Sequence, residues 1–418
     1  MSECFIGLGK CSYFYFYILG TIILNTIKRR TLSLFENIEL QKHPLVQDIY
    51  KFLSYLIFGA IFNIILKKYL NKKNEINNNS TKRKHSTKLI YHDALNYSNK
   101  DIFSFIIICS IYAFYLESSR IINYCGFSNL IFWTAHLASV LFFMARFFPQ
   151  HLYKHQIYPM IFIIIYGTIS KIILILFLDK NKNKYEENIS LSIFIIIFYI
   201  FISILFSFSE IRIKVFIDLK YLSPYSIIKL IGIIGFSLTI IISLIFKLFE
   251  YHEKFCFDDI FLYFKILGSN LNEKTNYFYV EICLITPLYL IMEFLCITFI
   301  IFIYKYLNPY YLILSDNIYF LVYLIFVFIN NKNYNDSESI YYFIINESTE
   351  IFEFIAFCIY LEIIELRFCG LNKNTRKNII KRGENDSKNY IENLNEDNNS
   401  SDEEDEDNDN KLELLNIN

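Results

Sequence analysis

The chain lacks the short motifs that mark many enzymes. It has no Gly-x-x-x-x-Gly-Lys phosphate loop, no His-Glu-x-x-His, no Gly-x-Ser-x-Gly and no Gly-x-Gly-x-x-Gly. A paired nucleophile and base of the kind that a membrane-embedded acyltransferase would need is missing from the sequence as well. We therefore expect neither an enzyme nor a bound cofactor. The net charge of −1 gives no support to nucleic-acid binding.

Metal-binding and disulfide patterns are also missing. The nine cysteines never form Cys-x-x-Cys, and most of them sit in or beside apolar runs. This placement favours small, membrane-buried apolar side chains over a metal or disulfide framework. Glu350 and Glu353 share a helix face as a carboxylate pair, but without a histidine nearby in sequence we predict no metal site.

Charge is scarce in the long apolar runs. Hydrophobic residues make up 54% of the chain, against about 45–50% in soluble domains. The charged residues crowd into the loop 67–101 and the C-terminal tail. A helix needs about 20 apolar residues, or about 17 at the short end, to cross a bilayer core of about 30 Å. Ten runs approach this length: Cys11–Ile27, Ile49–Leu66, Ile102–Leu116, Phe127–Ala145, Gln156–Leu178, Ser190–Phe208, Ser226–Phe246, Tyr279–Tyr304, Tyr311–Ile329 and Ile340–Ile364.

The positive charges of the loops predict the orientation. With a cytosolic N-terminus, the cytosolic segments up to Arg382 carry 22 Lys and Arg residues and the opposite side carries 13. The positive-inside rule then places both ends in the cytosol. The first run is read as a retained helix because Lys28, Arg29 and Arg30 follow it where a signal peptide would have a small-residue cleavage site. The same cluster leaves open a nine-span arrangement without the first helix.

Ten spans divide into two halves of five, so equivalent helices would enter the membrane from opposite faces. Pro44 and Pro224 each stand just ahead of the second helix of a half, where the missing N–H costs nothing. The sequence therefore predicts an all-α polytopic protein with inverted repeats at about 11–178 and 190–364 within a domain 1–370. The remaining segment 371–418 is basic, then polar, then acidic, and we predict a disordered cytosolic tail.

Several strings resemble the drug/metabolite transporter superfamily, in particular its nucleotide-sugar-transporter-like solute carrier branch. They are Leu19-Gly20-Thr21-Ile22, Asn25-Thr26, Lys42-His43-Pro44-Leu45-Val46-Gln47, Phe52-Leu53, Glu210, Leu222-Ser223-Pro224-Tyr225, Gly232-Ile233-Ile234-Gly235, Glu362-Ile363-Ile364-Glu365-Leu366 and Cys369-Gly370-Leu371-Asn372. The resemblance implies ten helices in two inverted halves around a cavity that opens to one side at a time. The chain departs from the family at Ser54-Tyr55 and Lys229-Leu230-Ile231, where related sequences tend to carry an acid.

Ionisable residues near mid-bilayer are the candidate functional residues, because each costs at least about 2.5–3.5 kcal/mol there. His136 and Glu293 lie within one turn of the predicted midplane, and a His/Glu pair of this kind would bind substrate or carry a proton. The alternative is that each is hydrogen-bonded to a neighbouring helix for packing. A second set, with a structural or coupling role, consists of Lys171, Glu347, Glu350 and Glu353.

Two functions are compatible with this pattern. The first is a secondary transporter that moves a small polar or anionic organic solute, of nucleotide-sugar or metabolite type, by alternating access. The second is a non-transporting membrane scaffold or receptor that keeps the fold and signals through its acidic tail. The expected partners are the solute and the lipid bilayer, with room for a homodimer. An endomembrane (Golgi, lysosome or vacuole) is the expected location, in preference to the plasma membrane.

Overall fold

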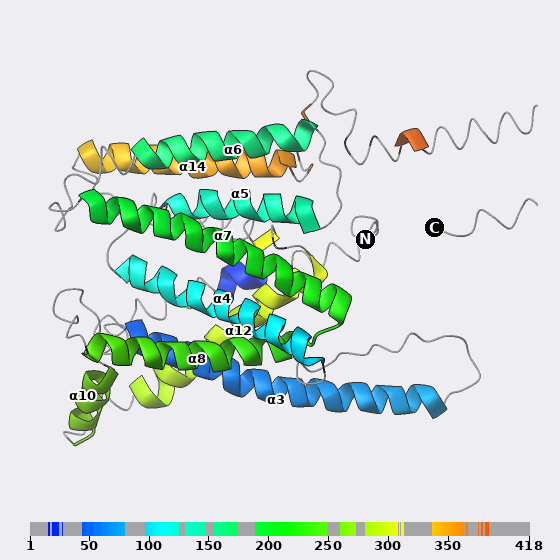
Figure 1. Cartoon of the computed structure of the whole chain (residues 1–418), viewed down its shortest axis with the longest axis vertical. Coiled ribbons are helices and arrows are strands. Elements are labelled where there is room, and N and C mark those ends of the chain that lie inside the picture. Colours follow the sequence, from blue (N-terminus) through cyan, green and yellow to red (C-terminus); the bar gives the residue numbers. More distant parts are fainter. Residues whose placement is uncertain are drawn as a thin grey trace, which may run out of the picture. The chain divides into compact units, whose positions relative to one another are not determined.

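The protein is described from a computed structural model (Figure 1). It covers residues 16, 19–24, 27, 44–79, 97–124, 130–147, 154–173, 189–248, 260–272, 281–307, 309, 311–312, 337–360, 362, 364–366, 375, 378 and 381–383. These residues are 94% helical and form no strand, which confirms the all-α class for this part of the chain. The helices are α3 (Pro44–Asn79), α4 (Asn99–Tyr124), α5 (Leu130–Phe147), α6 (Lys154–Ile173), α7 (Ile189–Lys220), α8 (Pro224–Leu248), α10 (Ile260–Asn272), α12 (Thr286–Tyr306), preceded by the π-helical turn η4 (Glu281–Ile285), and α14 (Ser337–Tyr360).

Four described segments are long and apolar enough to cross a membrane: Leu45–Lys72, Asn99–Ser118, Pro224–Ile245 and Cys283–Tyr306. They indicate a membrane protein. Helices α5, α6, α7 and α14 overlap further predicted runs. The runs Cys11–Ile27 and Tyr311–Ile329 and the tail 371–418 lie largely outside the described residues. The ten-helix count, the inverted repeats and the disordered tail therefore stay predictions.

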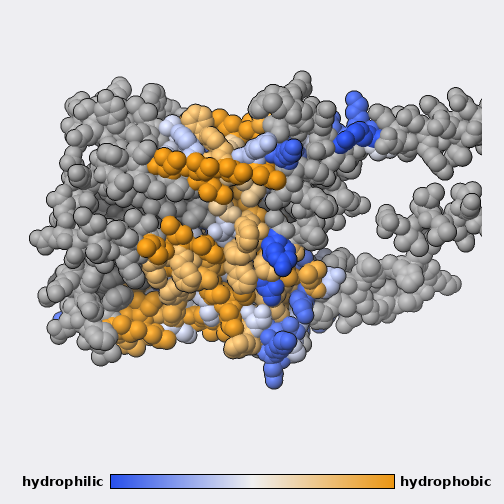
Figure 2. Space-filling view, turned by 45° about the horizontal axis from the view of Figure 1, so that its top comes forward, coloured by the Kyte–Doolittle hydropathy of each residue, from blue (hydrophilic) through white to orange (hydrophobic). Residues whose placement is uncertain are grey.

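The outer faces of the helices are apolar. Figure 2 shows apolar side chains gathered over one face of the described residues. Exposed isoleucines and leucines follow one another along α3 and α8: Ile57, Ile61, Ile64, Ile65, Ile233, Ile240, Ile241 and Leu244. A soluble monomer rarely leaves so much contiguous apolar surface in water. A bilayer covering these faces explains it.

The chain divides into two compact units. The first comprises Met1–His151 and Met160–Phe357, and the second comprises Leu152–Pro159 and Cys358–Asn418. Within the second unit, the Nε2 atom of His155 lies 2.8 Å from Oε1 of Glu362. Glu362 has a positive φ of 61°, an uncommon backbone conformation for a residue that carries a Cβ.

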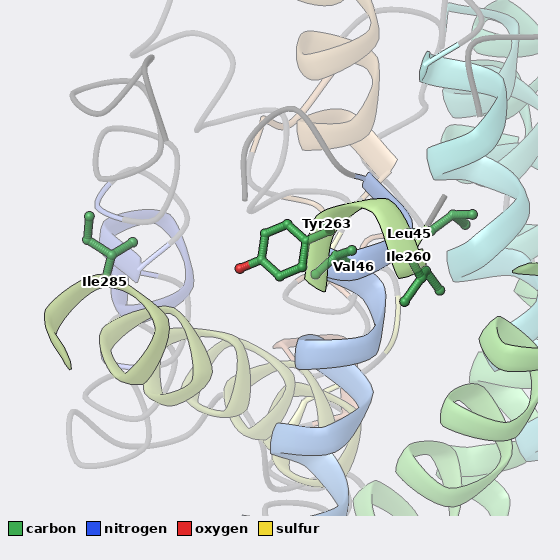
Figure 3. Close-up of a cluster of buried hydrophobic side chains, with 5 residues drawn as sticks. All are labelled: Leu45, Val46, Ile260, Tyr263 and Ile285. Carbon is green, nitrogen blue, oxygen red and sulfur yellow. The ribbon is translucent and has the colours of Figure 1, made fainter. Parts of the chain in front are cut away.

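Helix α10 was not predicted, because its 13 residues are too short for a span. It lies against the beginning of α3. Figure 3 shows Ile260 and Tyr263 of α10 beside Leu45 and Val46 of α3, and Ile285 belongs to the same buried cluster. Leu45 and Val46, which follow Pro44, thus pack against α10, the helix that lies between two predicted spans.

Helices α3, α4 and α7 extend beyond the predicted runs in a way that matters for the core, because each of these extensions carries a buried acidic residue. Helix α3 starts before Ile49 and includes Asp48, α4 continues past Leu116 and includes Glu117, and α7 continues past Phe208 and includes Glu210. These helices therefore continue past the spans that hydropathy marks. Arg212 and Lys214 were counted as loop charges, yet both are in α7, and Lys214 is buried.

The most extensive helix contact joins α3 and α8, and it depends on glycine. A Cβ atom on Gly232 of α8 would lie 2.5 Å from the backbone nitrogen of Leu56 and 2.9 Å from the carbonyl oxygen of Phe52. On α3, a Cβ on Gly59 would lie 2.9 Å from the backbone nitrogen of Lys229. Small residues allow membrane helices to approach to backbone contact in this way.

We expect Gly232→Ala to lower the melting temperature and the folding yield, because the backbone atoms of α3 cannot rotate away from the added methyl group. Forcing atoms into a packed interface typically costs about 1–3 kcal/mol. Gly268→Ala in α10 is the control, since no atom lies within 4 Å of its Cβ position. Thermal unfolding in detergent measures both variants. Equal melting temperatures would show that α3 and α8 are not in backbone contact.

Candidate functional site in the helical core

His136 lies in the first half of α5 with its side chain buried. Its Nδ1 atom lies 2.9 Å from the hydroxyl of Ser207, and its Nε2 atom lies 3.3 Å from Oε2 of Glu210. Both partners come from α7. The Ser207 hydroxyl is within hydrogen-bond distance of Nδ1, and the Nε2–Oε2 distance is within the range of an ion pair when His136 is protonated. The carboxylate beside His136 thus belongs to Glu210 and not to Glu293, the predicted partner.

Glu210 joins three helices. The hydroxyl of Tyr304 in α12 donates a hydrogen bond to Oε1 of Glu210, while Oε2 faces His136 in α5. All three side chains are at most 1% exposed. A buried carboxylate normally requires hydrogen bonds or a charge partner of this kind. The arrangement His136, Glu210 and Tyr304 forms a polar bridge from α5 through α7 to α12.

Lys214, one turn after Glu210, binds the C-terminal end of α12. Its Nζ atom donates to the carbonyl oxygens of Tyr304 at 2.9 Å and Leu307 at 2.8 Å, and it lies 2.9 Å from Oδ2 of Asp218. Carbonyls at a helix C-terminus have no partner within the helix, so a cation there satisfies them and the negative end of the helix dipole. This explains how a lysine can be buried in an apolar bundle.

Glu293 is also buried, in the first half of α12. Glu293 interacts electrostatically with Tyr55 in α3. Tyr112 in α4 interacts with Tyr55 in the same way. Tyr112 also interacts electrostatically with Tyr304. Electrostatic interactions thus link Glu293 through Tyr55, Tyr112 and Tyr304 to the contacts of Glu210 and His136, and these six buried residues are called the polar core below.

The second predicted set involves α6 and α14, which lie side by side (Figure 1). The ring of Phe352 lies 5.4 Å from that of Tyr166 and 6.5 Å from that of Phe162. Glu353 is buried at 2% exposure. The side chains of Lys171, Glu347 and Glu350 lie outside the described residues, so their roles stay predictions.

We predict that Lys171 is held by Glu347 or Glu350, because an unpaired charge at that depth in the membrane is costly. We expect Lys171→Met to lower the folding yield, because it leaves a carboxylate without its partner. A second change that removes the true partner, Glu347→Gln or Glu350→Gln, should restore part of the yield. Purely additive losses in both double variants would show that Lys171 meets neither glutamate.

No group of three or more His, Cys, Asp or Glu side chains with the geometry of a metal site occurs among the described residues. Of the cysteines described as free, Cys109, Cys296 and Cys358 are buried.

No protein-family model matches the chain, and no curated protein matches its sequence. The functional assignment therefore depends on the buried polar residues and on the membrane helices that hold them.

Proposed function

We propose that the protein is a secondary transporter of a small polar organic solute, of nucleotide-sugar or metabolite type, with the fold of the drug/metabolite transporter superfamily. The observation that carries the proposal is the polar core of His136, Glu210, Tyr304 and Glu293, buried between apolar helices. Ionisable groups inside membrane segments are costly, and most of those that are kept line a solute or ion pathway.

The geometry of the core supports this function. His136 and Glu210 contribute a titratable base and a carboxylate, and Tyr304 contributes a hydroxyl, on three separate helices. A solute that carries hydroxyl or amide groups can exchange hydrogen bonds with each of them. Helices that meet through polar groups can also separate, because water or solute can replace the lost contacts. Alternating access requires both properties.

The charge of the core bears on the solute. The buried carboxylates Asp48, Glu117, Glu210, Glu293 and Glu353 outnumber the buried lysines Lys51 and Lys214 among the described residues. An anionic solute would meet net repulsion in this environment, whereas a neutral polar solute or one accompanied by protons would not. Within the solute class above, we favour neutral compounds or anions carried together with protons.

The rival function is a membrane scaffold that signals through its acidic tail. Ser54-Tyr55 and Lys229, which stand where related transporters tend to carry acids, favour this alternative. It predicts that the polar core only packs the helices and that no solute binds there. An endomembrane location and a homodimer are compatible with either function.

A ligand screen on the purified protein separates the two functions. A solute that binds only the folded protein raises the melting temperature. At a free solute concentration of one hundred times the dissociation constant, it adds about 2.7 kcal/mol to the free energy of unfolding. The panel should contain nucleotides, nucleotide sugars, amino acids and drugs. We expect stabilisation by at least one class, and its loss in Glu210→Gln. Stabilisation by none of them, together with no uptake by reconstituted vesicles, would favour the scaffold.

A further inference from the structure

A second group of buried charges lies where α3, α4 and α8 meet. Asp48 and Lys51 come from the first two turns of α3, and Nζ of Lys51 lies 3.4 Å from Oδ1 of Asp48. Glu117 comes from α4. Asp48 and Glu117 are completely buried, and Lys51 is 6% exposed. The prediction from sequence missed this group, because the apolar runs were ended at Ile49 and Leu116.

The carboxyl group of Glu117 has two different surroundings. The hydroxyl of Thr239 in α8 donates to Oε1 and also lies 2.9 Å from the carbonyl oxygen of Gly235. The Oε2 atom is buried and has no hydrogen-bond partner among the described residues. Of the charged groups near Glu117, Asp48 has the strongest electrostatic interaction with its carboxyl group, followed by Lys51. One oxygen of a fully buried carboxyl group thus lacks a donor while a second carboxyl group stands beside it.

Among the described residues, the charges of this group balance when one of the two carboxyl groups holds a proton. If Asp48 and Glu117 are both ionised, two negative charges share one ammonium group inside an apolar bundle. Two adjacent buried carboxylates cannot both ionise without a large cost, and such pairs commonly hold one proton. With Glu117 protonated, Asp48 and Lys51 form an ion pair, and Oε2 of Glu117 becomes a donor toward Asp48. Every group named here then has a partner.

We propose that Asp48 and Glu117 form a proton-binding site, in which Glu117 is protonated beside the Asp48–Lys51 ion pair. Among the described residues, the groups that face this proton are Asp48 and Lys51 from α3 and Thr239 from α8. Thr239 belongs to the helix that packs most extensively on α3, so a change in the charge of Glu117 acts on the α3–α8 contact. Taken with the proposed transport function, on which this part rests, the site makes the proton the coupling ion.

A metal cation fits the site less well than a proton. Calcium and magnesium ions take about six or more oxygen ligands, whereas among the described residues this group supplies two carboxyl groups and one hydroxyl. The ammonium of Lys51 already stands 3.4 Å from Asp48, and it would repel a second cation. A proton needs a single oxygen.

Infrared spectroscopy of the purified protein tests the site without any solute, because a protonated carboxyl group has its own carbonyl band. We expect Glu117→Gln to remove one such band at neutral pH. Thr239→Val should shift that band, since it removes the hydrogen bond to Oε1. Asp48→Asn should also shift it, since an amide replaces the carboxylate that accepts from Glu117. Thr298→Val, at a buried threonine of α12, is the control and should leave the band unchanged.

A spectrum that Glu117→Gln leaves unchanged at every pH would overturn the proposal. A band that sodium removes at constant pH would also overturn it and would assign the site to a metal cation. If Glu117→Gln does not fold, the shift in Asp48→Asn decides. In vesicles, an inward proton gradient should raise wild-type uptake several-fold, whereas Glu117→Gln should respond to no gradient and keep solute exchange. Absence of wild-type uptake would contradict the transport function alone, since the infrared result does not depend on it.

Discussion

Replacing Glu210 with glutamine is expected to abolish solute uptake by reconstituted vesicles and to leave the protein folded. Glutamine keeps an oxygen that accepts from the Tyr304 hydroxyl, so the packing of α7 on α12 should change by less than about 1.5 kcal/mol, the usual net value of one hydrogen bond. The negative charge beside His136 is lost. A fall of at least tenfold in uptake corresponds to about 1.4 kcal/mol.

His136→Phe should have the same effect by removing the titratable ring, and Glu293→Gln should abolish uptake or its pH dependence. Ser237→Ala is the matched control, because this exposed serine of α8 bonds only to the carbonyl of Ile233 in its own helix. Melting temperature and uptake are measured on the same preparations. Uptake that survives the changes at His136 and Glu293 at every pH would rule out the polar core as the functional centre. A large loss of stability in each variant would instead assign these residues to packing.

Lys214→Met is expected to cause the largest loss of stability among the charge substitutions. The change removes the donor for two buried carbonyl oxygens at the end of α12, those of Tyr304 and Leu307. An unsatisfied buried acceptor costs about 1–3 kcal/mol. The lost ion pair with Asp218 adds little, because the Asp218 side chain is 25% exposed.

Lys220→Met provides the comparison in the same helix. The side chain of Lys220 is 47% exposed, and its Nζ lies 3.3 Å from Oδ1 of Asp101 at the surface. Such exposed pairs contribute about 0–1 kcal/mol. Thermal unfolding should therefore separate the two variants clearly. Equal effects of the two substitutions would show that Lys214 does not hold the end of α12.

The sequence was informative where a charge interrupts an otherwise apolar run. His136 and Glu293 stand deep inside such runs, and the structure buries both. Asp48, Glu117 and Glu210 were not named as candidate site residues, although Glu210 is part of the family resemblance, because each lies one or two residues outside a predicted run. Hydropathy ends a run at a charge, since it assigns that charge the cost of an unpaired ion.

The partners that remove this cost come from distant parts of the chain. Glu210 is bonded to Tyr304, and Glu117 is bonded to Thr239, which is 122 residues away in sequence. No pattern of neighbouring residues in the sequence predicts these pairs. For the same reason, the sequence marked Gly232 as part of a motif, but only the structure shows that it touches the backbone of α3.

Solute counterflow tests the central claim most directly. Vesicles containing the protein are loaded with a high concentration of an unlabelled solute that stabilises it, and they are then diluted into a trace of the labelled solute. A secondary transporter with its site in the polar core predicts a transient accumulation of label in wild-type vesicles and none in Glu210→Gln vesicles. Wild-type vesicles that match protein-free vesicles for every stabilising solute would contradict the account.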